Sequence, residues 1–193
     1  LFGIAHYGNR FENLTCTGNV KITNAEESED AEEIGGIAGV WHNGGEDVVF
    51  TNCKFTGKVT TNIERNKEWY GNLIGKPYSK DGKGKLIIDG YTFIADGVGI
   101  KDGEANTFYI FNANGLNYIN NRIKAGGTIK LGADIDLTGV EFDGLSAFHP
   151  ENNNTFDGQN YTISNWTNNS GASDMGFIKE WVGPIKNVKF DNC

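Results

Sequence analysis

Cysteine, proline and methionine are scarce in this sequence, which has three cysteines, three prolines and one methionine among 193 residues. Three cysteines are too few for a disulfide framework, and we expect Cys16 and Cys53 to be small buried hydrophobes. No run of about 18 or more apolar residues occurs, so the sequence predicts no membrane-spanning helix in this segment. Basic residues are outnumbered, and a net charge of −8 repels phosphate backbones, so we expect no nucleic-acid partner.

Hydrophobic residues are also few, at 38%, whereas glycine is abundant, with 27 residues. This balance favours a thin, repetitive β-structure with a narrow core over a helix-rich globule. Alternation of apolar and polar residues points the same way. Residues 128–137 (TIKLGADIDL) alternate strictly, and residues 155–164 (TFDGQNYTIS) place an Asp-Gly turn signal before a second alternating run. Both segments are therefore predicted to form strands.

Three segments of the chain repeat one another: 11–18 (FENLTCTG), 50–57 (FTNCKFTG) and 185–191 (IKNVKFD). When their asparagines are aligned, apolar residues coincide at two further positions, and we expect these to line one inner column: Leu14, Cys53 and Val188, then Cys16, Phe55 and Phe190. Three glycines upstream are spaced 36 residues apart: Gly3, Gly39 and Gly75. A repeat of this length, with glycine at the corners and short strands between, is typical of a solenoid.

The aligned asparagines, Asn13, Asn52 and Asn187, have a structural interpretation of their own. A side-chain amide at the same place in each turn of the chain can bond to the neighbouring turn and pass a ladder along the stack. The sequence favours this role over recognition of a ligand.

One segment departs from the strand pattern. From 112 to 124 apolar residues recur at spacings of three and four, Asn112 is a suitable N-cap, and Gly126 follows the run. We predict one short α-helix over 112–124, placed to cap the end of a strand stack.

The order of helix, Gly-Gly, and the phrases at 128–137, 155–164 and 176–188 resembles the repeat modules of bacterial surface proteins that carry the GLUG motif. Residues 36–39 (GIAG) match the motif's glycine core, whereas Asn72 and Lys179 depart from it. The resemblance implies an all-β chain folded as a right-handed parallel β-helix, an extracellular or cell-surface setting, and no catalytic site of its own.

Two domain arrangements fit this order. Either residues 1–103 are the tail of one module and 104–193 hold the capping helix and the first coils of the next, or one module wraps round with its cap supplied late. We favour the first, with the turn-rich segment 101–105 as the boundary. Both ends of the sequence fall inside a repeat, so we expect it to belong to a larger chain.

Paired carboxylates raise the question of catalysis. Asp134 and Asp136 flank one strand residue and therefore point the same way, as an acid/base pair would. The alternation puts both outward beside a turn, which favours a structural role. Asp89 and Asp157, each followed by glycine, are interpreted as turn residues.

No metal or cofactor is expected. His6, His42 and His149 are far apart in sequence and lack the short spacings of metal-binding motifs. Neither a nucleophile elbow nor a phosphate-binding loop occurs.

Aromatic residues at turns are the remaining candidates for binding. Trp41, Trp69, Tyr70 and Trp181 lie outside the alternating runs, where a flat ring can stack on a sugar face or, alternatively, cover a coil corner. The sequence thus predicts a non-catalytic, adhesin-like surface or secreted module that spaces, displays or binds a glycan or a host protein. The alternative is a carbohydrate-active β-helix enzyme, a polysaccharide lyase or hydrolase, which three carboxylates converging with a basic residue in one groove would favour.

Overall fold

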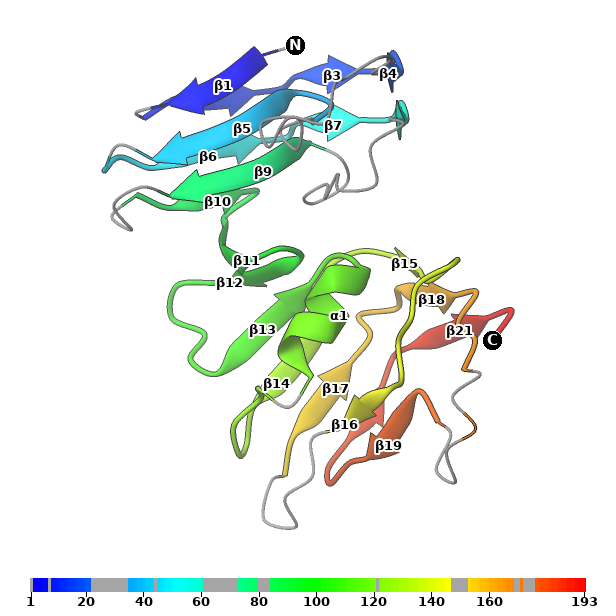
Figure 1. The fold of residues 1–193 in the computed structure, drawn as a ribbon. Coiled ribbons are helices and arrows are strands. Elements are labelled where there is room, and N and C mark those ends of the chain that lie inside the picture. The colour runs from blue at the N-terminus through cyan, green and yellow to red at the C-terminus, as the bar shows by residue number, and fades with distance from the viewer. Residues whose placement is uncertain are drawn as a thin grey trace. The chain divides into compact units, whose positions relative to one another are not determined.

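The computed structural model describes residues 2–6, 8–21, 35–43, 45–60, 73–79, 84–120, 122–146, 153–168, 171 and 176–193. Strands dominate them, and they divide into two units, Leu1–Phe93 and Ile94–Cys193 (Figure 1). This division precedes the boundary predicted at 103. The reason is that segment 101–105 is the loop of an antiparallel hairpin between β12 (Val98–Ile100) and β13 (Thr107–Ile110), so it belongs wholly to the second unit.

In the first unit, strands from successive repeats lie side by side in parallel sheets. Each strand pairs in parallel with its counterpart one turn later, in the orders β1-β5-β9, β2-β6-β10, β3-β7 and β4-β8. The strands are β1 (Phe2–His6), β2 (Arg10–Glu12), β3 (Thr15–Cys16), β4 (Val20–Lys21), β5 (Ala38–Asn43), β6 (Val48–Thr51), β7 (Lys54–Phe55), β8 (Val59–Thr60), β9 (Ile74–Ser79) and β10 (Leu86–Ile88), and β11 (Tyr91–Ala95) runs across the division.

The register of these strands agrees with the repeats in the sequence. Phe2 pairs with Ala38 and Ala38 with Ile74, which is a step of 36 residues each time, as the three spaced glycines predicted. Phe11 pairs with Phe50, and their rings stack with centroids 4.7 Å apart. In the stack of β2, β6 and β10, the paired residues Phe11, Phe50 and Ile88 lie above one another and are all buried.

Parallel pairing is not universal, which corrects the expectation of a purely parallel stack. Strand β11 runs antiparallel to β10 because the turn between them is only two residues long. Those residues, Asp89 and Gly90, have φ of 49° and 81°, and positive φ at both positions makes the tight hairpin turn that reverses a strand. The prediction of a turn at Asp89 is confirmed, although its Oδ1 accepts from the backbone N–H of Asn52 and closes no turn of its own.

The second unit also stacks turn upon turn. After the β12-β13 hairpin its strands pair in parallel, in the orders β13-β14-β17-β20, β15-β18-β21 and β16-β19. The remaining strands are β14 (Thr128–Leu131), β15 (Ile135–Asp136), β16 (Leu145–Ser146), β17 (Thr155–Asp157), β18 (Thr162–Ser164), β19 (Ile178–Glu180), β20 (Ile185–Lys186) and β21 (Lys189–Asp191).

Asparagine ladders connect neighbouring turns at the corners, as predicted. The Asn52 amide Nδ2 donates to Oδ1 of Asn13 at 2.7 Å, and Asn192 donates to Asn165 in the same way at 2.7 Å. Asn187 donates instead to Oδ1 of Asp157, at 3.0 Å. All the asparagines named here have φ between 49° and 56°, a left-handed conformation that asparagine adopts more readily than other side chains. Asparagine thus provides both the left-handed backbone at the corner and the side-chain hydrogen bond of the ladder.

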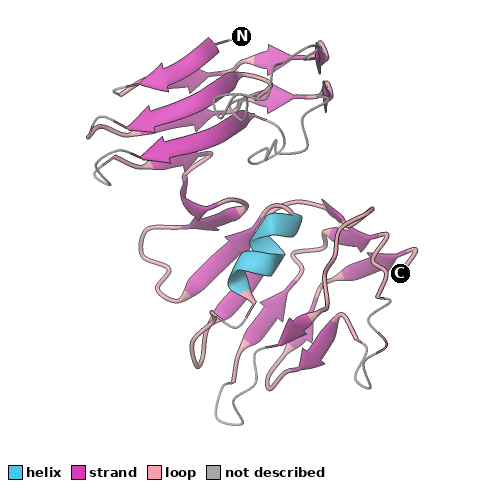
Figure 2. Ribbon diagram, viewed as in Figure 1, coloured by secondary structure: helices cyan, strands magenta, loops and turns pink. Residues whose placement is uncertain are grey.

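The one helix among the described residues, α1 (Ala113–Ile119), is shorter than the predicted span of 112–124 (Figure 2). Asn112 is its N-cap as expected, accepting from the N–H of Gly115 at 2.9 Å. The helix ends early because the backbone of Asn120 is extended, with φ −55° and ψ 127°, while its side chain bonds to residues 144 and 146. Ile123 is buried all the same, beyond the helix.

The core of the second unit joins α1 to the strands. Leu116 and Ile119 of the helix lie in one cluster with Leu131, Phe156 and Ile163, all at most 1% exposed. In the predicted inner column, Cys53 and Phe55 are buried. Cys16, Leu14 and Val188 are half-buried.

Phe190 contradicts the prediction, because its side chain is 46% exposed. It lies on β21, the edge strand of its sheet, so no described strand covers its outer side. Its inner side still contacts the core, since its ring lies 5.1 Å from that of Phe177.

Glycine at the GIAG segment has a steric cause. A Cβ added to Gly36 would overlap the ring of Phe55, so the aromatic side chain occupies the space above this backbone. Glycine at position 36 is therefore required by the close approach of the Phe55 ring.

Candidate functional site

The aromatic residues singled out as binding candidates are placed differently from one another. Trp69 and Tyr70 lie outside the described residues. The backbone of Trp41 is in β5, paired with Ala5 and Pro77 of the adjacent strands, and nothing is described of its side chain.

Trp181 is a packing residue for the most part. It is half-buried against the core of the second unit, and its ring meets that of Phe156 edge to face, with centroids 6.2 Å apart. Its Nε1 is buried and has no hydrogen-bond partner in the described part of the chain. Part of the Trp181 side chain is still exposed, and a binding role for it stays a prediction.

Asp134 and Asp136 are exposed on the outer side, as predicted, but they are engaged in the fold. Asp134 accepts from the backbone N–H of Thr162 on the next turn, at 2.7 Å. Asp136 accepts from Asn165 and from both the N–H and the hydroxyl of Thr138. The hydrogen bond from Asn165, and then those from Thr138, lower the pKa of Asp136. A carboxyl with a lowered pKa is a poor general acid at neutral pH.

Asp157 makes the predicted turn and also contacts Lys186 and Asn187. Its Oδ1 accepts from the N–H of Gln159 at 3.1 Å and from the amide of Asn187, while Lys186 lies 3.4 Å from its Oδ2. Burial raises the pKa of this carboxyl, but the hydrogen bonds from Asn187 and Gln159 and the charge of Lys186 outweigh burial and lower it. Asp157 is therefore ionised, and its contacts link its own strand to the segment at residues 186–187.

The histidines are brought together only in part. His6 and His42 occupy paired positions on β1 and β5, although the sequence separates them widely, and His149 lies outside the described residues. Within the described ranges, no group of three or more histidine, cysteine or carboxylate residues is placed to hold a metal ion.

A concave site that the sequence analysis did not identify lies in the second unit. It has a volume of about 600 Å³, within the range of roughly 300–1,000 Å³ that small-molecule sites occupy. We call it the polar groove. Its lining residues come from the end of α1, from the segment after β15 and from the segment after β18: Asn117, Asn120, Gly139, Val140, Glu141, Phe142, Asp143, Thr167 and Asn168.

Hydrogen bonds fix the wall of the polar groove. The Asn120 amide donates to the carbonyl of Gly144 at 3.1 Å and accepts from the N–H of Ser146 at 2.9 Å, which ties α1 to the segment 139–146. From the other side, Trp166 Nε1 donates to the carbonyl of Phe142 at 2.7 Å. The wall is thus set before any ligand arrives, which reduces the entropy lost on binding.

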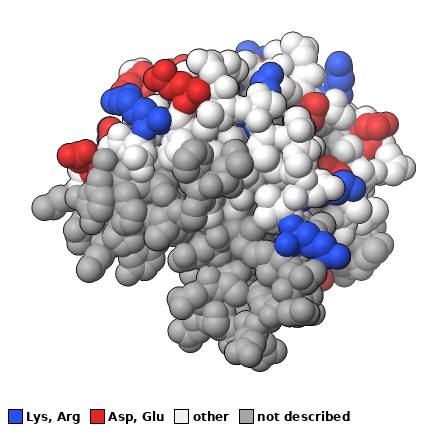
Figure 3. Space-filling model, turned by 90° about the horizontal axis from the view of Figure 1, so that it is seen from above, with Lys and Arg blue, Asp and Glu red and all other residues white. Residues whose placement is uncertain are grey.

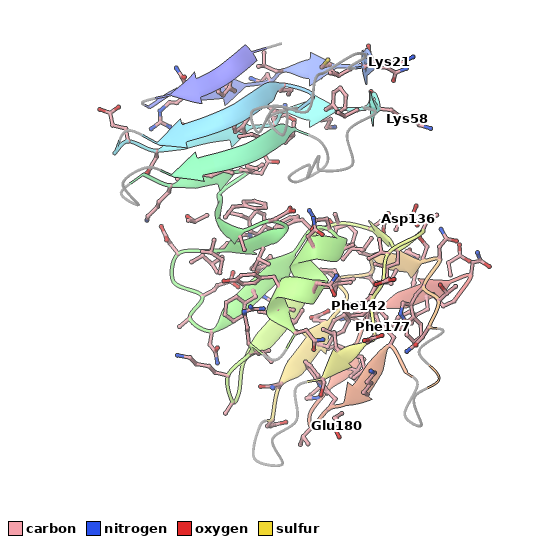
Figure 4. All side chains as sticks on the ribbon, in the orientation of Figure 1. Lys21, Lys58, Asp136, Phe142, Phe177 and Glu180 are labelled. Carbon is pink, nitrogen blue, oxygen red and sulfur yellow. The ribbon has the colours of Figure 1, made fainter. Side chains whose placement is uncertain are left out.

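The floor of the polar groove is aromatic. The Phe142 side chain is only 3% exposed, and its ring lies 5.2 Å from that of Phe177 (Figure 4). Trp166 meets Phe177 edge to face at 5.7 Å. These packed rings hold Phe142 in place, and with it the two residues on either side, Glu141 and Asp143, which are exposed.

The charge of the polar groove is of one sign. Glu141 and Asp143 have no hydrogen bond or ion pair in the part of the chain that the structure describes, and the lining contains no lysine or arginine. On the face shown in Figure 3, by contrast, described acidic and basic side chains are interspersed. The groove therefore offers two uncompensated negative charges beside neutral amide and hydroxyl groups.

One signal in the sequence could have identified this site. In residues 140–143 (VEFD) apolar and acidic residues alternate, which puts both carboxylates on one side of a strand-like segment. The sequence analysis attended to Asp134 and Asp136 instead, and the contributions of Asn117 and Thr167 depend on contacts between distant segments.

A second cluster of charged side chains ties the β12-β13 hairpin to β14. Glu104 Oε2 accepts from the Tyr109 hydroxyl at 2.8 Å, and Lys130 Nζ lies 3.2 Å from the same oxygen and 3.1 Å from the hydroxyl. Hydrogen bonds from Tyr109 and Lys130 lower the pKa of Glu104. Burial raises the pKa of Tyr109, and the hydrogen bond with Tyr109 raises that of Lys130. The cluster is internally satisfied and has a structural role.

This cluster, with Asp136 and Asp157, predicts acid sensitivity. All three carboxyls have a pKa lowered by folding, so their contribution to stability is present above the unfolded values near pH 4 and is lost as the pH falls through the lower folded values. We expect the melting temperature to fall between about pH 4 and pH 2. Glu104→Gln should show a smaller decline than the wild type in circular-dichroism melts. Asp102→Asn, an exposed control in the same hairpin loop, should show the same decline as the wild type. An identical decline in Glu104→Gln, Asp102→Asn and the wild type would contradict the assignment.

Comparison of the chain with protein-family models, curated proteins and solved structures finds no match. Among the described residues, no helix has the length and apolar character needed to cross a membrane.

Proposed function

We propose that the chain is a non-catalytic module of a bacterial surface or secreted protein, built as a right-handed parallel β-helix, that acts in adhesion or display by binding a glycan or a protein. The observation that carries the proposal is the turn-by-turn stacking of counterpart strands, joined at the corners by asparagine ladders. This arrangement is extended by adding turns, which suits a spacer or display element. The GLUG resemblance of residues 36–39 and 108–193 supports the same setting.

The use of the carboxylates supports binding over catalysis. A glycosidase needs one carboxyl with a raised pKa to protonate the leaving group. Asp136 and Asp157 have lowered pKa values, and their oxygens accept hydrogen bonds within local turns and from asparagines of neighbouring strands. A lyase acting on uronic acids needs a cation for the substrate carboxylate, and none of the described residues that line the polar groove is basic. The groove is therefore proposed as a binding site.

The enzyme alternative has one observation in its favour, because Glu141 and Asp143 share the polar groove. The test is to incubate the chain with neutral, amino and acidic polysaccharides, to follow retention by affinity electrophoresis, and to assay reducing ends and unsaturated uronate absorbance. We expect retention by at least one glycan class without turnover. Turnover that is lost in Glu141→Gln would establish the enzyme and overturn the proposal.

A further inference from the structure

We propose that the polar groove selects saccharides that carry a free, protonated amine, such as a deacetylated hexosamine polymer. This inference rests on the proposed glycan-binding function and adds the class of ligand. The features that carry it are the unpaired carboxylates, the amide and hydroxyl groups around them, and the rigid wall.

The first feature is charge. Glu141 and Asp143 flank the buried Phe142, and the order exposed, buried, exposed places both carboxylates on the solvent side of that ring. Neither has a hydrogen-bond or ion-pair partner among the described residues, so a ligand ammonium would meet no competing cation from that part of the chain. The net charge of −8 acts in the same direction at longer range. Anionic saccharides are repelled for the same reason.

The second feature is hydroxyl recognition. Asn117 is exposed on α1 and Thr167 is exposed across the groove, and neither side chain has a hydrogen bond within the described ranges. An amide supplies two donors and an acceptor, and a hydroxyl supplies one donor, which suits the alternating donor and acceptor pattern of a polyol. A simple ammonium ion would leave these groups unused. The combination therefore favours an amino sugar over an isolated cation.

The third feature is shape. The wall formed by 139–146 is held by Asn120 and Trp166, so the carboxylates are presented from a fixed backbone. Val140 lies half-buried at the same wall and gives a small apolar surface for the C–H face of a sugar ring. A cavity of about 600 Å³ accommodates a ligand of this kind without a change in the fold.

The test compares ligands of one length and different charge. Isothermal titration calorimetry is run with tetramers of glucosamine, N-acetylglucosamine and galacturonic acid, at pH 6 and low salt, and with a tetralysine peptide. We expect the glucosamine tetramer to bind about three- to tenfold more tightly than its acetylated form, since each exposed charge pair contributes a few-fold at most. The galacturonate should not bind. The difference should shrink at about 1 M salt, where the Debye length is only about 3 Å.

Matched variants locate the site. Glu141→Gln and Asp143→Asn remove charge without changing size, and both side chains are exposed, so folding should be preserved. Each should reduce the preference for the free amine and leave the weak binding of the acetylated tetramer unchanged. Asp102→Asn removes an exposed carboxylate of the same unit outside the groove and should bind as the wild type does.

The outcomes separate this inference from the proposed function. Equal binding of the free and acetylated tetramers overturns the inference and leaves glycan binding intact. Equal binding of tetralysine overturns the saccharide part, and a preference that persists in both groove variants places the site elsewhere and also overturns it. If no tetramer binds, both the inference and the glycan arm of the proposed function fail.

Discussion

Replacement of Phe156 by alanine is expected to lower the free energy of unfolding of the second unit by about 3–5 kcal/mol, the usual cost of truncating a buried phenylalanine. Phe156 is fully buried on β17. Its ring meets those of Phe177 and Trp181 at 6.4 and 6.2 Å, both edge to face. Alanine would leave a cavity between aromatic neighbours that are themselves held by packing, so the site has little capacity to collapse.

The matched control is Phe190→Ala. Phe190 is the same residue type in the same unit, but it is 46% exposed, and its ring contacts that of Phe177 in the core. Truncation there should cost about 1–2 kcal/mol at most, since about half of the ring area is already in water. Urea unfolding followed by tryptophan fluorescence and circular dichroism measures both. Equal losses at the two positions would show that burial of Phe156 does not stabilise this unit.

The second large effect on stability is expected at the ladder of side-chain hydrogen bonds in which Asn165 takes part. We expect Asn165→Ala to destabilise the second unit by about 2–5 kcal/mol, from two lost side-chain hydrogen bonds at about 0.5–1.5 kcal/mol each and a left-handed backbone that alanine adopts at a cost of about 1–2 kcal/mol. Asn165 has φ 56°, donates to Asp136 at 2.9 Å and accepts from Asn192 at 2.7 Å. It is therefore the middle member of a three-residue ladder.

Glycine at the same position separates the two causes. Asn165→Gly loses both hydrogen bonds but keeps the left-handed backbone without strain, so it should cost about 1 kcal/mol less than Asn165→Ala. Asn165→Gly should also raise the pKa of Asp136 towards its ordinary value, because the hydrogen bond from Asn165 is the largest cause of its lowering. Carbon-detected NMR titration of the carboxyl measures this shift. If alanine and glycine cost the same, the left-handed conformation is not the cause.

Features that repeat were open to prediction from sequence. In a stack of parallel strands each residue lies on its equivalent in the next turn, so the spacing of residues in the sequence is also the register in space. That is why the step from Phe2 to Ala38 and the bond between Asn13 and Asn52 agree with the pattern. The N-cap at Asn112 was equally predictable, because capping depends on neighbours three residues away.

Features that depend on a contact with one particular distant residue could not be predicted in the same way. The end of α1 is set by the bonds of Asn120 to residues 144 and 146, and the exposure of Phe190 by the absence of a described strand beyond β21. Trp181 is a packing residue because of where Phe156 lies.

The polar groove is a further feature that the sequence did not predict and the tertiary structure determines. Sequence alone determined a repetitive, acidic, strand-rich chain with asparagine at its corners, because those properties follow from composition and period. Only the tertiary structure decided which carboxylates accept hydrogen bonds from other described residues and which do not. Asp136 and Asp157 meet hydrogen-bond donors from neighbouring turns, whereas Glu141 and Asp143 project from a wall that Trp166 and Asn120 fix from two sides. Hydrogen-bond partners and concave surfaces arise from contacts between distant segments, and local pattern carries no record of them.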